Sequence, residues 1–301
     1  MNLTSDSLSV LPVSGQIVAA FGRQYLVEVT NGEILSCVLR GKKSDAVCGD
    51  QVQVKHTTVG QGVIEAISPR DTLIYRSNTI RKKLIAANIT QIIIVISAVP
   101  SFDEDLVNRC LVTAENQNIK ALIVLNKTDL INPTRAVLPK LSLYQKIGYT
   151  LLQLSAEKDI TPLVPYLQGH LNVLVGQSGM GKSTLINALI PDADRATAEI
   201  SATLDSGRHT TTHAQLYHLD KNTHIIDSPG IQEFGLHHIN NRDLAWGFIE
   251  FHPYIGQCKF SDCLHINEPN CAIGRAVQEK KIDPRRLRIY QNLITLRKKS
   301  P

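Results

Sequence analysis

Residues 176–183, Gly-Gln-Ser-Gly-Met-Gly-Lys-Ser, have the types and spacing of a phosphate-binding loop. Gly176, Gly179 and Gly181 allow consecutive backbone N–H groups to face one polyphosphate at a helix N-terminus, where the helix dipole favours an anion. Lys182 can place a positive charge on the outer phosphates, and the Ser183 hydroxyl can bind Mg²⁺. The other residues of the run and the one after it are expected to bind the nucleotide as well: Gln177, Ser178, Met180 and Thr184.

A second motif, Asn-Lys-Thr-Asp at residues 126–129, predicts which base is bound. The Asp129 carboxylate can accept two hydrogen bonds from guanine, whereas adenine has no donors there and would leave the carboxylate unpaired. Lys127 can lay its aliphatic stem along the base, and Asn126 can tie this loop to the phosphate loop. Ser155 and Ala156 can bring a backbone N–H to guanine O6. The sequence therefore predicts GTP and GDP, with Mg²⁺, as ligands.

Two further segments are typical of nucleotide switches. In Asp-Ser-Pro-Gly at residues 227–230, Asp227 is expected to hold Mg²⁺ through water and the Gly230 N–H to sense the γ-phosphate. In Gly-Arg-His-Thr-Thr-Thr-His at residues 207–213, Thr211 or Thr212 is expected to close over the metal, and the sequence does not rank them. The expected Mg²⁺ ligands are Ser183, Thr212 and Asp227.

The residue that positions the attacking water is less well defined by the sequence. Apolar Ile231 follows the Asp-Ser-Pro-Gly segment, where a water-orienting glutamine would often stand. His209 and His213, which flank the threonines, are the candidates, and solvated loop histidines are the alternative. We therefore expect slow turnover alone, with acceleration when a partner orders the switch.

The order of these motifs is unusual. A standard GTPase has the phosphate loop first and the guanine-reading motifs last, whereas here Asn126 and Ser155 precede Gly176. Each strand–helix unit still presents its loop at the same sheet edge, so a circularly permuted chain can assemble the same pocket. The segment after Gly230 then leads directly into the C-terminal region, which gives a nucleotide-dependent movement a short covalent path to it.

A third group of reactive residues lies near the C-terminus: Cys258, Cys263, His265 and Cys271. Three thiolates and one imidazole make a closed Zn²⁺ ligand set, which can fold a region too small for its own core. An iron–sulfur cluster would more usually have four thiolates. Because the set leaves no position for water, we assign the zinc a structural role.

The elements that must position these residues fall into three regions. We expect a small OB-type β-barrel over residues 1–70, after a short disordered lead, with an SH3-like barrel as the alternative. Residues 71–240 are expected to form the permuted α/β GTPase domain and residues 241–301 a mainly helical zinc domain. In the central domain, apolar runs predict buried parallel strands at 91–98, 121–125, 150–154 and 171–175, with helices at 106–116, 138–147 and 182–189.

The charge distribution fits a polyanionic partner. The formal net charge is +5, and basic residues gather between Arg275 and Lys299, where only Glu279 and Asp283 are acidic. No signal peptide is evident, and the longest apolar run is far shorter than the ~20 residues of a membrane-spanning helix. We expect a cytoplasmic protein, a monomer, with no membrane contact.

With all these motifs on one chain, the sequence resembles the circularly permuted, small-subunit-dependent GTPases of the RsgA (YjeQ) family, over nearly its whole length. The resemblance rests on the permuted order together with the zinc signature, Cys-Lys-Phe-Ser-Asp-Cys-Leu-His at 258–265 and Asn-Glu-Pro-Asn-Cys at 267–271. It implies an OB-fold, a GTPase domain and a zinc domain. It also implies late maturation of the bacterial small ribosomal subunit, binding to its rRNA, and GTP hydrolysis that the subunit stimulates.

The sequence also allows three other interpretations. One is a GTP-controlled RNA-binding module with negligible hydrolysis, and a second is a P-loop ATPase or kinase, against which Asp129 argues. The third is a zinc-bearing DNA-binding regulator, which lacks a recognisable reading helix.

Overall fold

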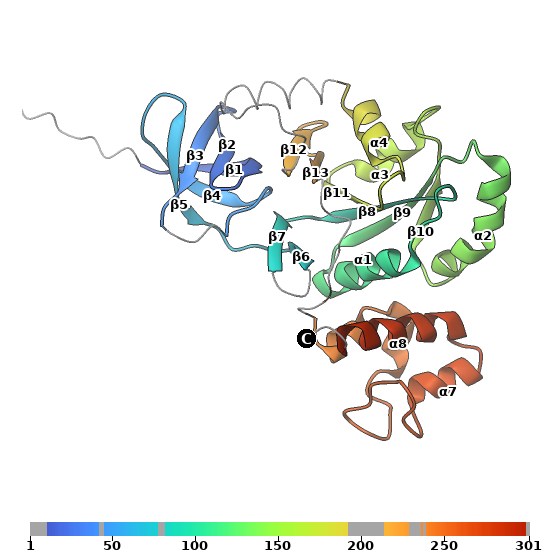
Figure 1. Cartoon of the computed structure of the whole chain (residues 1–301). Coiled ribbons are helices and arrows are strands. Elements are labelled where there is room, and N and C mark those ends of the chain that lie inside the picture. The colour runs from blue at the N-terminus through green and yellow to red at the C-terminus, as the bar shows by residue number, and fades with distance from the viewer. Residues whose placement is uncertain are drawn as a thin grey trace, which may run out of the picture.

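The computed structural model describes residues 11–41, 45–77, 82–191, 214–228, 236 and 239–298, and of residues 76–77, 82–83 and 296–298 it describes the backbone alone. The chain builds a β-barrel, a central sheet flanked by helices, and a helical C-terminal region that lies under the central sheet (Figure 1). None of the described helices combines the length and the apolar character that crossing a membrane requires.

Five strands make the N-terminal barrel. They are β1 (Val13–Phe21), β2 (Gln24–Val29), β3 (Ile34–Leu39), β4 (Gln51–His56) and β5 (Gln61–Ile67). Their order is β1-β2-β3-β5-β4, and β4 pairs back with β1 to close the barrel. All pairs are antiparallel except β3 with β5. Alternate residues such as Ile17, Val27 and Leu35 are fully buried inside. The expected OB-type barrel is confirmed.

The central sheet has the order β10-β9-β8-β11-β13-β12. Its strands are β8 (Gln91–Ser97), β9 (Lys120–Asn126), β10 (Thr150–Gln153), β11 (Leu171–Val175), β12 (Gln215–His218) and β13 (His224–Asp227). All neighbours are parallel except β12 and β13, which a short turn joins as an antiparallel pair. The edge strand β12 also pairs with barrel strand β1 at Ala19 and Gln215, so the barrel and the sheet are continuous.

Helices cover both faces of this sheet, as the apolar runs in its strands predict. Along β8, Ile92, Ile94 and Ile96 pack in the core under α1 (Glu104–Gln117), whereas Ile93 and Val95 pack in the core under α3 (Val164–Leu167) and α4 (Lys182–Leu189). This division follows from the two-residue period of a strand. The helix α2 (Ile131–Lys146) and the 3₁₀ turn η1 (Thr161–Leu163) complete the layers.

Helix α1 has strong local signals at both ends. The Asp103 side chain accepts a hydrogen bond from the Asp105 backbone N–H and so caps the N-terminus, and Glu104 and Asp105 favour the positive end of the helix dipole. Asn118 ends the helix in the left-handed conformation, with φ 59°. The observed helix is slightly longer than the expected 106–116.

A hairpin that the sequence analysis missed connects the barrel to the sheet. Its strands, β6 (Leu73–Ser77) and β7 (Lys82–Ala87), are antiparallel and form a separate sheet. The Gln117 side chain at the end of α1 holds β6 through the Leu73 backbone, accepting from its N–H at 2.7 Å and donating to its carbonyl at 2.9 Å.

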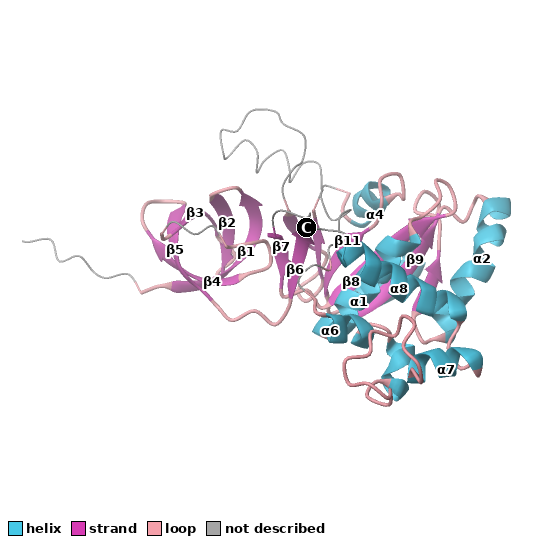
Figure 2. Ribbon diagram, turned by 60° about the horizontal axis from the view of Figure 1, so that its bottom comes forward, coloured by secondary structure: helices cyan, strands magenta, loops and turns pink. Residues whose placement is uncertain are grey.

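The C-terminal region is built from α6 (Asn241–Trp246), the 3₁₀ segment η2 (Ile249–Tyr254), α7 (Ala272–Gln278) and α8 (Pro284–Lys298). Its core, around Phe248, Phe251 and Tyr290, also includes Val112 of α1, and Figure 2 shows α8 lying beside α1. Arg286 of α8 is 1% exposed, pairs with Glu250 and donates to Asn108 of α1. Arg286, which belongs to the basic C-terminal cluster, is therefore buried in an internal ion pair and cannot contact a polyanion.

Candidate functional site

The predicted nucleotide residues meet at one edge of the central sheet. The parallel strands β9, β10, β11 and β13 end at Asn126, Gln153, Val175 and Asp227, and their carboxyl ends share that edge. The strand β11 lies between β8 and β13, where successive connections leave in opposite directions, which is the usual position of a ligand crevice in such sheets. The motifs occur in a permuted order along the chain, but they converge at this one edge of the sheet.

The phosphate loop has the backbone geometry that its glycines predict. Gly179 and Gly181 have φ values of 79° and 92°, in the left-handed region that other residues rarely adopt. A Cβ at Gly181 would also collide with the Asn126 side chain, and one at Gly176 with the Val95 carbonyl. Glycine at position 181 therefore lets the phosphate loop approach the base-reading loop closely, and glycine at 176 lets it pass close to β8. Helix α4 begins within the loop, at Lys182.

Lys182 and Asp227 form the charged part of the site. The Lys182 ammonium donates to the carbonyls of Gly176 and Gln177 at 2.7 and 2.8 Å, so it lies inside the curl of the loop. Burial lowers the pKa of Lys182, which Asp227 partly opposes. Burial also raises the pKa of Asp227, against the effect of Lys182. Ser183 is exposed in the first turn of α4. A carboxylate and a hydroxyl here are the hard oxygen ligands that Mg²⁺ prefers.

Asn126 connects three loops through one side chain. Its Nδ2 donates to the Met180 carbonyl of the phosphate loop at 2.9 Å, and its Oδ1 accepts from the Ala156 N–H at 2.9 Å. Asn126 is only 2% exposed, so neither bond competes strongly with water. The side chain thus fixes the spacing between the segments expected to bind base and phosphates.

Asp129 and Ser155 line a cavity of about 180 Å³ beside the phosphate loop, together with Lys127, Ala156, Gly181 and Thr184. A hydrogen bond from the Ser155 side chain lowers the pKa of Asp129, so the carboxylate is ionised and can accept hydrogen bonds near neutral pH. Lys127 has φ 61°, and its ammonium donates to the Val99 carbonyl at 3.3 Å. This cavity joins the expected base site to the phosphate loop.

Two of the predicted loop residues direct their side chains away from this cavity. Met180 is 1% exposed within the core, where the Ser97 hydroxyl donates to its sulfur at 3.3 Å. Gln177 Oε1 accepts from the Asp103 N–H at 2.7 Å and so fixes the start of α1. Both residues can reach a ligand only through their backbones. The sequence analysis did not foresee this second use of Gln177.

Five predicted residues lie outside the described part of the chain: Thr211, Thr212, His209, His213 and Gly230. Their expected roles stay predictions.

The four predicted zinc ligands come together in the C-terminal region. Their ligand atoms all lie within 4.8 Å of one another, although the chain spacing between them is irregular. His265 Nδ1 is 3.5, 3.5 and 3.4 Å from the sulfurs of Cys258, Cys263 and Cys271, and Cys258 Sγ is 3.9 Å from Cys271 Sγ. Tetrahedral Zn²⁺ requires about 3.6 Å between N and S and about 3.8 Å between sulfurs. The ligand set fits zinc.

Backbone N–H groups can stabilise negative charge on two sulfurs of this cluster. The N–H of Ala272 donates to Cys258 Sγ at 3.3 Å, and that of Gly274 to Cys271 Sγ at 3.4 Å. Burial raises the pKa of the Cys263 thiol to about 12 in the protein alone. A bound cation is therefore needed for this thiol to lose its proton near neutral pH. Glu268, which the sequence analysis missed, shapes the loop by accepting from the N–H groups of Leu264 and Ile266 at 2.9 and 2.8 Å.

Comparison with known proteins places this geometry in context. The sequence model of the family described as RsgA GTPase matches residues 67–237. The small ribosomal subunit biogenesis GTPase RsgA of Nitrosospira multiformis is 60% identical over 288 residues, covering 96% of this chain and 92% of the relative. The protein of the same name from Nitrosomonas europaea is 53% identical over 291 residues, with 96% and 93% covered.

Two solved structures share the arrangement. The crystal structure of YjeQ from Thermotoga maritima superposes with a TM-score of 0.75 at 29% identity, covering 96% of this chain and 99% of that one. The structure of YloQ, described as a circularly permuted GTPase, gives a TM-score of 0.73 at 26% identity and covers 99% of both chains.

Proposed function

The chain belongs to the RsgA GTPase family, and from this premise we propose that it couples a guanine-nucleotide switch to binding of the small ribosomal subunit. It is a GTPase that acts in small-subunit biogenesis. We further propose that the chain binds the subunit's rRNA and that the bound subunit accelerates hydrolysis. A single copy would act, in the cytoplasm.

One observation supports this function most directly. Asn126 hydrogen-bonds both to Met180 in the phosphate loop and to Ala156 in the base loop, so segments 54 and 30 residues away meet at one buried side chain. We assign guanine selection to Asp129, which lines the cavity between them. GTP would then bind with its phosphates on the backbone of residues 176–183 and with Lys182 beside the outer phosphates.

Mg²⁺ would be held by Ser183 and Asp227, with Thr211 or Thr212 closing the site, and would supply positive charge that offsets the charge of the outer phosphates. The described residues provide the backbone of the phosphate loop and the Lys182 ammonium. The candidates for orienting water, His209 and His213, belong to the switch segment. A partner that orders this segment would therefore raise the rate, and slow turnover by the protein alone follows.

The zinc site would fix the C-terminal region against the GTPase domain. Cys258, Cys263, His265 and Cys271 provide a closed set of four ligands, and the loop around them packs against the core that contains Val112 of α1. We assign Zn²⁺ a structural role, because no ligand position is left for water or substrate.

The test is the rate of GTP cleavage in single turnover with purified small subunits, with large subunits and with neither. We expect acceleration by small subunits alone. Binding to small subunits that depends on GTP but leaves the cleavage rate unchanged would instead indicate an RNA-binding module controlled by nucleotide. Equal acceleration by both subunits would contradict the assigned partner.

A further inference from the structure

Helix α1 contacts both the phosphate loop and the C-terminal region. Its 14 residues span about 20 Å, from a first turn beside the phosphate loop to a last turn beside α6. A helix is a rigid element, so a displacement imposed on one part of it is carried to the rest. Helix α1 can therefore transmit a change in the C-terminal region to the nucleotide site.

Two arginines of α8 hold the first half of α1. The Arg285 guanidinium binds the Glu104 carboxylate. The buried Arg286 guanidinium donates to Asn108 Oδ1, and Asn108 itself is 1% exposed. Charged donors make stronger hydrogen bonds than neutral ones, and burial of the Asn108 contact reduces competition from water. The start of α1 is therefore attached firmly to α8.

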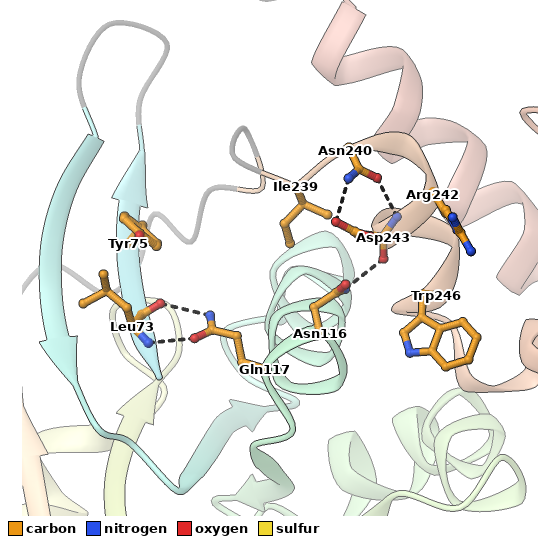
Figure 3. Close-up of a pocket in the computed structure, with 9 residues that line it drawn as sticks. All are labelled: Leu73, Tyr75, Asn116, Gln117, Ile239, Asn240, Arg242, Asp243 and Trp246. Atoms are coloured by element: carbon orange, nitrogen blue, oxygen red, sulfur yellow. Dashed lines mark hydrogen bonds between the residues drawn. The ribbon is translucent and has the colours of Figure 1, made fainter. Parts of the chain in front are cut away.

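The second half of α1 is held by the same C-terminal region. Val112 lies in the core of that region and leaves no room for a Cβ at Gly247. The Asn116 amide donates to the carbonyl of Asp243 in α6 at 2.8 Å (Figure 3). A displacement of the C-terminal region would therefore carry α1 with it. The contacting residues of α1 are four apart, as one face of a helix requires: Glu104, Asn108, Val112 and Asn116.

Gln177 joins the first turn of α1 to the phosphate loop. Its Oε1 accepts from the N–H of Asp103, the N-cap residue of α1, at 2.7 Å. The Gln177 carbonyl accepts from the Lys182 ammonium at 2.8 Å. One residue therefore holds the start of α1 with its side chain and, with its backbone, the lysine expected beside the outer phosphates.

We propose that Gln177 is a positioning residue through which the C-terminal region controls how tightly the phosphate loop holds its nucleotide. While α8 holds α1, the first turn of α1 fixes Gln177, and Gln177 fixes the carbonyl that binds Lys182. A partner that displaces α8 loosens this series of contacts, so the ammonium is less well ordered and the nucleotide leaves faster. The inference rests on the proposed nucleotide site.

The α1 link differs from the covalent path that leads from residues 227–230 into the C-terminal region. The covalent path begins at the segment expected to sense the γ-phosphate, so it distinguishes GTP from GDP. The backbone of a phosphate loop instead holds phosphates that both nucleotides share. The α1 link therefore acts on GDP as well, and the release of GDP is the quantity that isolates it.

The dissociation rate of a ribose-labelled fluorescent GDP from the zinc-loaded full-length protein tests the link. Gln177→Met keeps the length of the side chain but removes the acceptor for the Asp103 N–H. It should speed dissociation roughly 2- to 12-fold, as the loss of one hydrogen bond does. An unchanged rate would overturn the proposal.

Arg285→Met loosens the other end of the link. The Glu104 carboxylate keeps its ion pair with Lys140 at 2.9 Å, so the substitution leaves no buried charge unpaired. It should speed dissociation about twofold or more, the least that one net hydrogen bond contributes. Arg288→Met, at an exposed position on the same helix, is the matched control and should leave the rate unchanged. Equal rates for Arg285→Met and the wild type would contradict the link.

The double variant separates one link from two local effects. Gln177 and Arg285 contact different residues of α1, so independent effects on the dissociation rate would multiply. If α1 is the link, Arg285→Met should have no further effect in the Gln177→Met background, because the phosphate loop is already separated from α1. Multiplication of the two factors would overturn the proposal.

Thermodynamic linkage predicts an effect in the opposite direction as well. At saturating concentration, GDP should slow hydrogen exchange at the backbone amides of α8 in the wild type, and Gln177→Met should remove most of this effect. Equal slowing in both proteins would contradict the link, since the nucleotide would then stabilise α8 by another path.

The same measurements separate this inference from the proposed nucleotide site. Tight GDP binding by the wild type, with release from every variant at the wild-type rate, would overturn the link and leave the site intact. A wild-type protein that binds no guanine nucleotide would overturn both.

Discussion

Asn126→Ala tests the structural basis of the nucleotide pocket. The Asn126 amide makes two buried hydrogen bonds, to the Met180 carbonyl and from the Ala156 N–H, both at 2.9 Å. Each bond contributes about 0.5–1.5 kcal/mol net, so the substitution removes about 1–3 kcal/mol of loop ordering. The nucleotide must then order both loops as it binds, and its affinity should fall roughly 5- to 150-fold.

The assay combines calorimetric titration of GDP and GTP with hydrogen exchange. The Ala156 amide should lose protection in the variant, which reports directly on the lost bond. Asn187→Ala, at an exposed position on α4, is the matched control and should leave both measurements unchanged. Faster exchange at Ala156 with affinity within twofold of wild type would refute the reasoning, since the loops would then bind nucleotide without being tied together.

Four other substitutions test separate parts of the structure. Asp129→Asn should relax guanine selectivity at least tenfold in competition binding against adenine nucleotides, because an amide replaces a charged acceptor of about 1.5–3 kcal/mol per bond. Lys182→Ala should abolish tight nucleotide binding, and unchanged affinity would show that the phosphates lie elsewhere. Cys258→Ala, or removal of zinc by a chelator, should lower the melting temperature of the C-terminal region without altering the base preference of the pocket. Arg286→Met should destabilise the protein by about 3–5 kcal/mol in denaturant unfolding, because it leaves the Glu250 carboxylate buried without its partner.

Much of the architecture could be predicted because its signals are local. The barrel strands β3, β4 and β5 alternate buried and less buried residues, which is the two-residue period of a strand. The run 171–175 is apolar except for Asn172 and is buried throughout, as a central strand is. The strand and helix around the phosphate loop, β11 and α4, have the expected bounds. The Cys3His cluster could be predicted from residue type, since three cysteines and a histidine in so short a stretch are typical of a metal site.

Other features could not be predicted because they depend on contacts between distant segments. Helix α2 runs from Ile131 to Lys146, whereas the sequence analysis expected a helix over 138–147. Proline is most common in the first turn of a helix, so Pro139 gives no local sign of the two helical turns that precede it. The hairpin of β6 and β7 was missed, since the Gln117 side chain that holds it is 44 residues away in the chain.

The basic C-terminal cluster shows the same limit for function. Arg285 and Arg286 have the composition of a phosphate-binding patch, but their guanidinium groups are bound to Glu104 of α1 and to Glu250. Only the tertiary structure distinguishes an arginine that is held in an internal ion pair from one that can contact a phosphate.

The central claim is that Asp129 and the phosphate loop together select guanine nucleotides. Isothermal titration of the zinc-loaded protein with GDP and with ADP, in the presence of Mg²⁺, tests it most directly. Two hydrogen bonds to a carboxylate predict that GDP binds tighter than ADP by roughly two orders of magnitude or more. Equal affinities, or binding of neither nucleotide, would contradict the claim.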